Sequence, residues 1–139
     1  MIVLDTNVIS ELVRTTPDPA VMQWLAAQRE PELHITAMTA AELLDGVLRL
    51  PRGARRSALV ATVAKVLESD FAGRVLSFSA ESALDYADIV TTRRAAGNPV
   101  GAQDAIIAAV TRCHGATLAT RNTRDFSGVG VPLINPWRP

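Results

Sequence analysis

Short apolar runs alternate along the chain with longer segments in which apolar residues recur at helical spacing. The short runs are rich in valine, isoleucine and leucine, and they are too brief for helices, so they predict strands. The predicted strands cover residues 1–5, 33–36, 74–78, 116–120 and 131–134. Strands that alternate with helices are typical of a parallel sheet that carries helices on both faces. The pattern therefore predicts an α/β fold.

Capping residues divide the longer segments into helices, which are predicted at residues 8–14, 19–28, 40–50, 54–70, 80–96 and 103–114. Asp18 followed by Pro19 suits an N-cap and the first helical residue, and Ser79 suits another N-cap. Thr39 and Glu42 are three residues apart, which is the capping-box pattern. We therefore expect a helix that begins after Thr39, and this gives Glu42 an ordinary structural role as well as a possible chemical one.

Size and composition narrow the class of protein. The chain has 139 residues and is 48% hydrophobic and 20% charged, which predicts one globular domain over residues 1–139 and excludes a fibre or a disordered tail. A single cysteine, Cys113, excludes a disulfide framework, and with His34 and His114 it gives too few ligands for zinc. We expect Cys113 to be a small core residue. No segment has the length of a signal peptide or a membrane span, so we expect a cytoplasmic protein without a membrane partner.

The charges balance, with 14 basic and 14 acidic residues. A protein that holds duplex DNA by charge alone would usually be basic, so direct DNA binding is not expected. One basic run contains Arg49, Arg52, Arg55 and Arg56. This run is either a solvated helix face or a face that grips phosphate, because arginine forks match phosphate geometry.

Oxygen-bearing side chains follow the predicted strands or begin the helices after them: Asp5, Glu42, Asp104, Asn122 and Asp125. Each has an ordinary alternative role as a turn residue, a cap or a favourable charge at a helix start. Ligands of parallel sheets collect at the carboxyl ends of strands, so these groups converge if the first and fourth strands are neighbours. Several adjacent carboxylates need a cation or shifted pKa values, and oxygen ligands suit Mg²⁺ or Mn²⁺. Such an ion supports phosphodiester hydrolysis.

Four segments, residues 1–7, 39–43, 103–108 and 120–126, together with the ending at 131–137, resemble the PIN domain. More narrowly, they resemble the VapC/FitB-type toxin ribonucleases of bacterial type II toxin–antitoxin pairs. The resemblance extends over essentially the whole chain. It implies a three-layer α/β/α sandwich with a central, mainly parallel sheet. It also implies an endoribonuclease that depends on Mg²⁺ or Mn²⁺.

The resemblance also assigns roles by position. Asp5, Glu42 and Asp104 match the core acidic metal ligands, and Asp125 matches a fourth, more variable acid. Asn122 shares or divides this fourth position, so both are candidate catalytic residues. The supporting polar positions are matched by Asn7 and Thr120. The implied partners are the RNA substrate, a small antitoxin, a second copy of the chain in a homodimer, and DNA only through the antitoxin.

Three other functions fit parts of the pattern. A response-regulator domain expects a lysine at the end of a late strand, but the only lysine, Lys65, lies in a predicted helix. A haloacid-dehalogenase-like phosphatase expects a second aspartate two residues after Asp5, where this chain has Asn7. A catalytically silent module that acts only by binding an antitoxin is the remaining alternative, and the intact acids argue against it.

Overall fold

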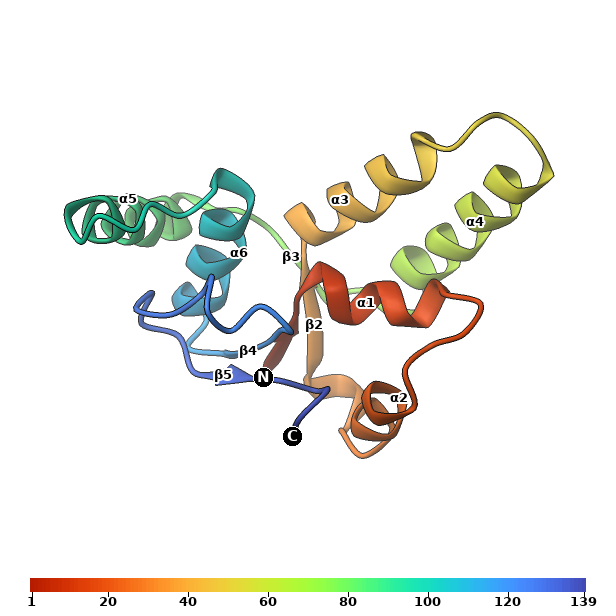
Figure 1. The fold of residues 1–139 in the computed structure, drawn as a ribbon, viewed down its shortest axis with the longest axis horizontal. Coiled ribbons are helices and arrows are strands. Elements are labelled where there is room, and N and C mark those ends of the chain that lie inside the picture. The colour runs from red at the N-terminus through yellow and green to blue at the C-terminus, as the bar shows by residue number, and fades with distance from the viewer.

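A five-stranded parallel sheet forms the middle layer of the computed structural model, which describes residues 1–139 (Figure 1). Its strand order is β3-β2-β1-β4-β5, and every neighbouring pair is parallel. The central strand, β1, pairs with β2 on one side and β4 on the other, as the sequence argument required. The strands are β1 (Ile2–Leu4), β2 (Leu33–Thr36), β3 (Val75–Leu76), β4 (Thr117–Ala119) and β5 (Leu133–Ile134).

Helices cover both faces of the sheet, which confirms the α/β class and the three-layer arrangement (Figure 1). α1 to α4 lie on one face, and α5 and α6 lie on the other. The longest helix is α5, and none of the helices is both long and apolar enough to span a bilayer. The helices are α1 (Thr6–Val13), α2 (Pro19–Ala26), α3 (Ala37–Leu48), α4 (Ala54–Lys65), α5 (Ala80–Ala95) and α6 (Ala102–Cys113). Two short helical turns, η1 (Glu30–Glu32) and η2 (Val66–Asp70), complete the set.

The sheet is buried on both faces because its strands alternate their side chains between two hydrophobic clusters. Leu4 packs with Ile35 in the cluster beneath α1 to α4, whereas Val3 packs with Leu118 in the cluster beneath α5 and α6. All four side chains are fully buried. This double burial fixes β1 at the centre of the molecule and places the residue that follows it, Asp5, at the carboxyl edge of the sheet.

Two helices begin earlier than the sequence pattern predicted. α1 begins at Thr6 instead of Val8, because the Asp5 carboxylate caps it and accepts the Thr6 N–H at 2.8 Å. α3 begins at Ala37, so the predicted cap at Thr39 is wrong. Thr36 is the true N-cap, and its hydroxyl accepts the Thr39 N–H at 3.0 Å. In both places the chain passes from strand to helix without a loop.

Candidate active site

Asp5 lies at the carboxyl end of β1 and is 4% exposed. Three donors hold its carboxylate in place. The Thr6 N–H donates to Oδ1 at 2.8 Å, and the Asn7 side-chain amide and the Thr120 hydroxyl donate to Oδ2 at 2.9 and 2.6 Å. Burial raises the pKa of Asp5, the three hydrogen bonds offset part of this effect, and the negative charge of Asp125 adds to it. The carboxylate is therefore fixed in direction before any ligand arrives.

The two predicted supporting residues connect Asp5 to the loop that follows β4. The Thr120 hydroxyl accepts the Asn122 N–H at 3.0 Å while it donates to Asp5. The Asn7 side-chain carbonyl accepts the Arg121 N–H at 3.2 Å. Since Thr120 is fully buried, this network fixes the start of the loop against β1.

Glu42 and Asp104 face each other across a polar cleft of about 460 Å³ between α3 and α6. No apolar residue lines this acid cleft, whose walls are Glu42, Asp45, Gly46, Arg49, Gly101, Gln103 and Asp104. Because α3 begins at Ala37, Glu42 lies in its second turn and takes no part in capping. This placement corrects the capping-box expectation and frees the Glu42 carboxylate for the cleft.

Two polar atoms beside the acid cleft have no hydrogen-bond partner in the chain, although both are buried. They are Oε1 of Glu42 and the hydroxyl of Thr6. Burial raises the pKa of Glu42, and the charges of Asp5 and Asp104 raise it further, while the nearby Thr6 hydroxyl offsets part of the effect. An unpartnered buried carboxylate oxygen is costly unless a ligand satisfies it.

Asp104 lies in the first turn of α6. Burial raises its pKa, and so do the charges of Asp5 and Asp125, whereas the Arg93 guanidinium lowers it. The side chain of Asp125, the proposed fourth acid, is exposed in the loop after β4 and makes no hydrogen bond. The exposed Asn122 side chain is also without a partner, so the choice between these two residues stays open.

Sequence reasoning missed Arg93, the buried arginine behind this loop, which is 6% exposed. Its Nε donates to the carbonyl of Asn98 at 2.7 Å, and its Nη1 donates to the carbonyls of Asp125 and Ser127 at 2.8 and 3.0 Å. The available signal was spacing, because Arg93 follows the buried Ile89 by one helical turn of α5. The cleft residue Asp45 was also missed, and it lies three residues after Glu42 on the same face of α3.

The acids lie at one edge of the sheet but do not by themselves form a closed metal cage. No three acidic, histidine or cysteine side chains lie close enough to surround an ion. Their charges still interact, since Asp5, Glu42 and Asp104 each have a raised pKa to which another acid of the group contributes. A hard divalent ion often uses few carboxylates and completes its shell with water or substrate phosphate. The donor set and the unpartnered Glu42 oxygen therefore fit such an ion.

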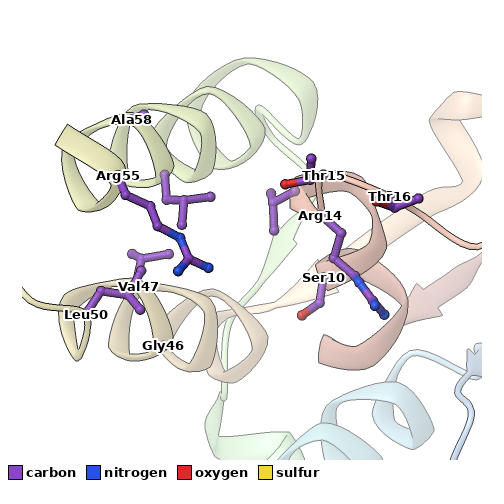
Figure 2. A pocket seen from close by; sticks show the side chains of 11 residues that line it. Ser10, Arg14, Thr15, Thr16, Gly46, Val47, Leu50, Arg55 and Ala58 are labelled. Atoms are coloured by element: carbon purple, nitrogen blue, oxygen red, sulfur yellow. The ribbon is translucent and has the colours of Figure 1, made fainter.

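A larger cleft of about 640 Å³ lies away from these acids, between α1, α3 and α4. Figure 2 shows Arg55 extending from α4 toward α3, with Arg14 on the opposite wall. No carboxylate lines this cleft, so it offers no acid chemistry.

The predicted basic run is divided in space, because Arg49 pairs with Asp45 at 2.8 Å while Arg55 faces the larger cleft. Cys113, expected in the core, is only partly buried.

Comparisons with known proteins extend over nearly the whole chain. The sequence profile of the PIN domain family matches residues 2–131. VapC ribonuclease Y4jK of Sinorhizobium fredii is 42% identical over 139 residues, which are 100% of this chain and 99% of that protein. Toxin FitB of Neisseria gonorrhoeae is 38% identical over 137 residues, 99% of each chain. The solved structure of FitAB bound to an IR36 DNA fragment superposes with a TM-score of 0.93 at 37% identity, over 100% of this chain and 97% of that one.

Proposed function

Because the chain belongs to the PIN-domain family, and within it to the VapC/FitB-type toxin ribonucleases, we propose that it is the RNA-cleaving toxin of a type II toxin–antitoxin pair. It hydrolyses RNA phosphodiester bonds in the cytoplasm. The observation that carries the proposal is the buried, unpartnered Oε1 of Glu42, at a cleft shared with Asp104 and within the field of Asp5. Only the Thr6 hydroxyl lies near enough to offset the charge of Glu42, so a bound cation would relieve both the unsatisfied oxygen and the repulsion among the acids.

Nucleases of this family generally need a divalent metal ion. We assign Asp5, Glu42 and Asp104 as the residues that hold Mg²⁺ or Mn²⁺, and Asp125 or Asn122 as the fourth position. When bound, the ion supplies the Lewis acidity that phosphodiester hydrolysis requires.

The chain's own residues prepare this site. Asn7 and Thr120 fix the direction of the Asp5 carboxylate by hydrogen bonds to its Oδ2. The acid cleft has polar walls throughout, so a hydrated RNA backbone would enter it without contact to apolar groups once a cation offsets the repulsion from the carboxylates. The buried Arg93 holds the carbonyl of Asp125 and thereby positions the proposed fourth acid.

The partners follow from the same family. The structure that superposes with a TM-score of 0.93 is FitAB bound to a DNA fragment. We propose that an antitoxin covers the acid cleft of this chain, that two copies of the chain form a homodimer, and that DNA is reached through the antitoxin. The zero net charge of the chain supports this indirect route to DNA.

The test is cleavage of total RNA by the purified chain without antitoxin, in Mg²⁺, in Mn²⁺ and in EDTA. We expect discrete fragments that require the metal, disappear in Asp104→Asn and persist in Asp88→Asn. The Asp88 variant is a matched control because this carboxylate lies on α5 in an exposed ion pair with Arg112. A folded protein that cleaves nothing with either metal would refute the ribonuclease in favour of a module that only binds its partner.

A further inference from the structure

A second polar cleft, of about 490 Å³, lies at the same edge of the sheet as the acids. Its walls come from the two segments that follow β4 and β5. These strands are parallel neighbours and β4 also pairs with β1, so their carboxyl ends meet beside the residue that ends β1. The lining residues are Arg121, Thr123, Asn135, Trp137 and Arg138. We call this the arginine cleft.

Contacts within the chain connect the arginine cleft to Asp5. The Arg121 N–H donates to the Asn7 side-chain carbonyl at 3.2 Å, and the Asn7 amide donates to Oδ2 of Asp5 at 2.9 Å. The Arg121 guanidinium lies over the Trp137 ring, 5.2 Å from its centroid. Trp137 is partly buried and packs against the hydrophobic cluster beneath α1 to α4, so it is a fixed platform. The backbone of Arg121 is therefore linked to Asp5 through Asn7, while its guanidinium is held over the Trp137 ring.

The charge of the arginine cleft is unopposed. No carboxylate lines it, and neither Arg121 nor Arg138 forms an ion pair within the chain. A guanidinium stacked on an aromatic face keeps its N–H groups free at its edge, in the planar fork that matches a phosphate. The stacked Arg121 and the unpaired Arg138, at the same edge of the sheet as the acids, attract the RNA backbone that the acids alone would repel.

We propose that the arginine cleft is a phosphate subsite for single-stranded RNA, which holds a backbone phosphate next to the bond that is cut. This inference rests on the proposed ribonuclease function. Arg121 and Arg138 bind the phosphate, and Trp137 orients Arg121. Because the contacts are to the backbone, the subsite contributes affinity without base preference. The strand then runs from the arginine cleft across Asp5 to the acid cleft between α3 and α6.

The test measures binding apart from cleavage. A fluorescein-labelled twelve-nucleotide RNA of mixed sequence is titrated with protein in EDTA, and anisotropy gives Kd at several NaCl concentrations. For single-stranded RNA, the slope of the logarithm of the binding constant against the logarithm of the salt concentration becomes less steep by about 0.7 for each phosphate contact that is removed. Because Arg121 and Arg138 share one phosphate, the double variant Arg121→Gln with Arg138→Gln should reduce the slope by about 0.7, and each single variant should reduce it by part of this amount. If the variant and the wild type bind RNA equally at 1 M salt, a slope lower by 0.7 makes the Kd of the variant about fivefold weaker than that of the wild type at 0.1 M salt.

The matched control is the double variant Arg29→Gln with Lys65→Gln. It removes the same charge from exposed surface ion pairs that lie before β2 and β3, at the opposite edge of the sheet. Arg138 is exposed and forms no ion pair, so Arg138→Gln keeps the test valid even if Arg121→Gln loses stability. Slopes and Kd values equal to those of the control would overturn the subsite.

Two further readouts separate the possible failures. If the wild type cleaves total RNA but neither arginine variant changes RNA binding, the subsite is wrong and the ribonuclease stands. If RNA binding depends on both arginines but no metal supports cleavage, the ribonuclease fails and the phosphate contact stands. A fluorescein-labelled twelve-residue glutamate peptide is titrated in the same way as an alternative ligand. If binding of this peptide depends on Arg121 and Arg138 while binding of RNA does not, the proposal is overturned in favour of a site for an acidic protein segment.

Discussion

The Arg93 side chain offers the sharpest test of how the loop after β4 is held in place. Its guanidinium is buried beneath that loop and donates three hydrogen bonds to backbone carbonyls, two of them within the loop itself. Arg93→Met keeps the length and the apolar stem of the side chain but removes all three donors. We expect the variant to be less stable and its loop to be less well fixed.

The magnitude follows from the contacts. A hydrogen bond from a charged donor contributes about 1.5–3 kcal/mol to stability. The three carbonyls that accept from Arg93 belong to exposed residues, so water replaces part of each lost hydrogen bond in the variant. We therefore expect a loss of about 3 kcal/mol, below the sum of three such bonds. The unfolding entropy of a chain of this length is on the order of 0.3 kcal/mol per degree, so the melting temperature should fall by about 10 °C.

The assay is urea denaturation followed by circular dichroism, with thermal melting as a second measure. Arg94→Met is the matched control, because Arg94 is the next residue of α5 and its exposed side chain makes no hydrogen bond or ion pair. Its effect should stay within about 0.5 kcal/mol. If Arg93→Met lies within about 1 kcal/mol of this control, the hydrogen bonds of Arg93 do not hold the loop.

Other expected outcomes concern the acids. Saturating Mg²⁺ or Mn²⁺, at about one hundred times Kd, should stabilise the wild type by about 2.7 kcal/mol, or about 9 °C, and equal shifts in wild type and Asp104→Asn would remove Asp104 from the ligands. Because the folded pKa of Asp104 is raised, its ionisation destabilises the fold as pH rises. In EDTA the stability of Asp104→Asn relative to wild type should therefore increase as the pH rises above about 4, and a constant difference in urea melts would contradict the assignment. Thr120→Val should cost about 1–2 kcal/mol and lower the RNA cleavage rate, whereas Thr111→Val, which removes a hydroxyl bonded within α6, should leave the rate unchanged. Equal cleavage rates in the two threonine variants would show that Thr120 does not position Asp5.

The layers of the fold were predictable because the buried strands of a parallel sheet consist of short runs of apolar residues. Val3 and Leu4 belong to such a run, and both lie fully buried on opposite faces of the sheet. Parallel pairing then brings the ends of β1 and β4 together, so the proximity of Asp5 and Thr120 followed from strand order alone. Asp104 was also predictable, because it begins the helix that leads back to β4.

The exact helix starts were not predictable from local patterns. Thr36 and Thr39 are both good caps, and they are three residues apart. Pairing of Thr36 with Leu76 of β3 keeps Thr36 in the sheet, and this tertiary contact decides which threonine ends the strand and caps the helix. Arg93 was hidden for a related reason. Its partners are backbone carbonyls of a distant loop, and because every residue has a backbone carbonyl, no residue type in the sequence indicates such a partner.

The displaced cap has a consequence for function. In a capping box, Glu42 would turn back to the helix start, and its carboxylate would be satisfied by the chain. With Thr36 as the cap, the helix end is satisfied without Glu42, and the Glu42 oxygen is left buried beside two other acids. The fold thus meets its own hydrogen-bonding needs with threonines and leaves the carboxylates in mutual repulsion. Whatever brings positive charge to this edge, whether a metal ion or a basic side chain of an antitoxin, relieves the same repulsion. Metal and antitoxin should therefore compete for Glu42 and Asp104, and inhibition by an antitoxin needs no change in the fold of the chain.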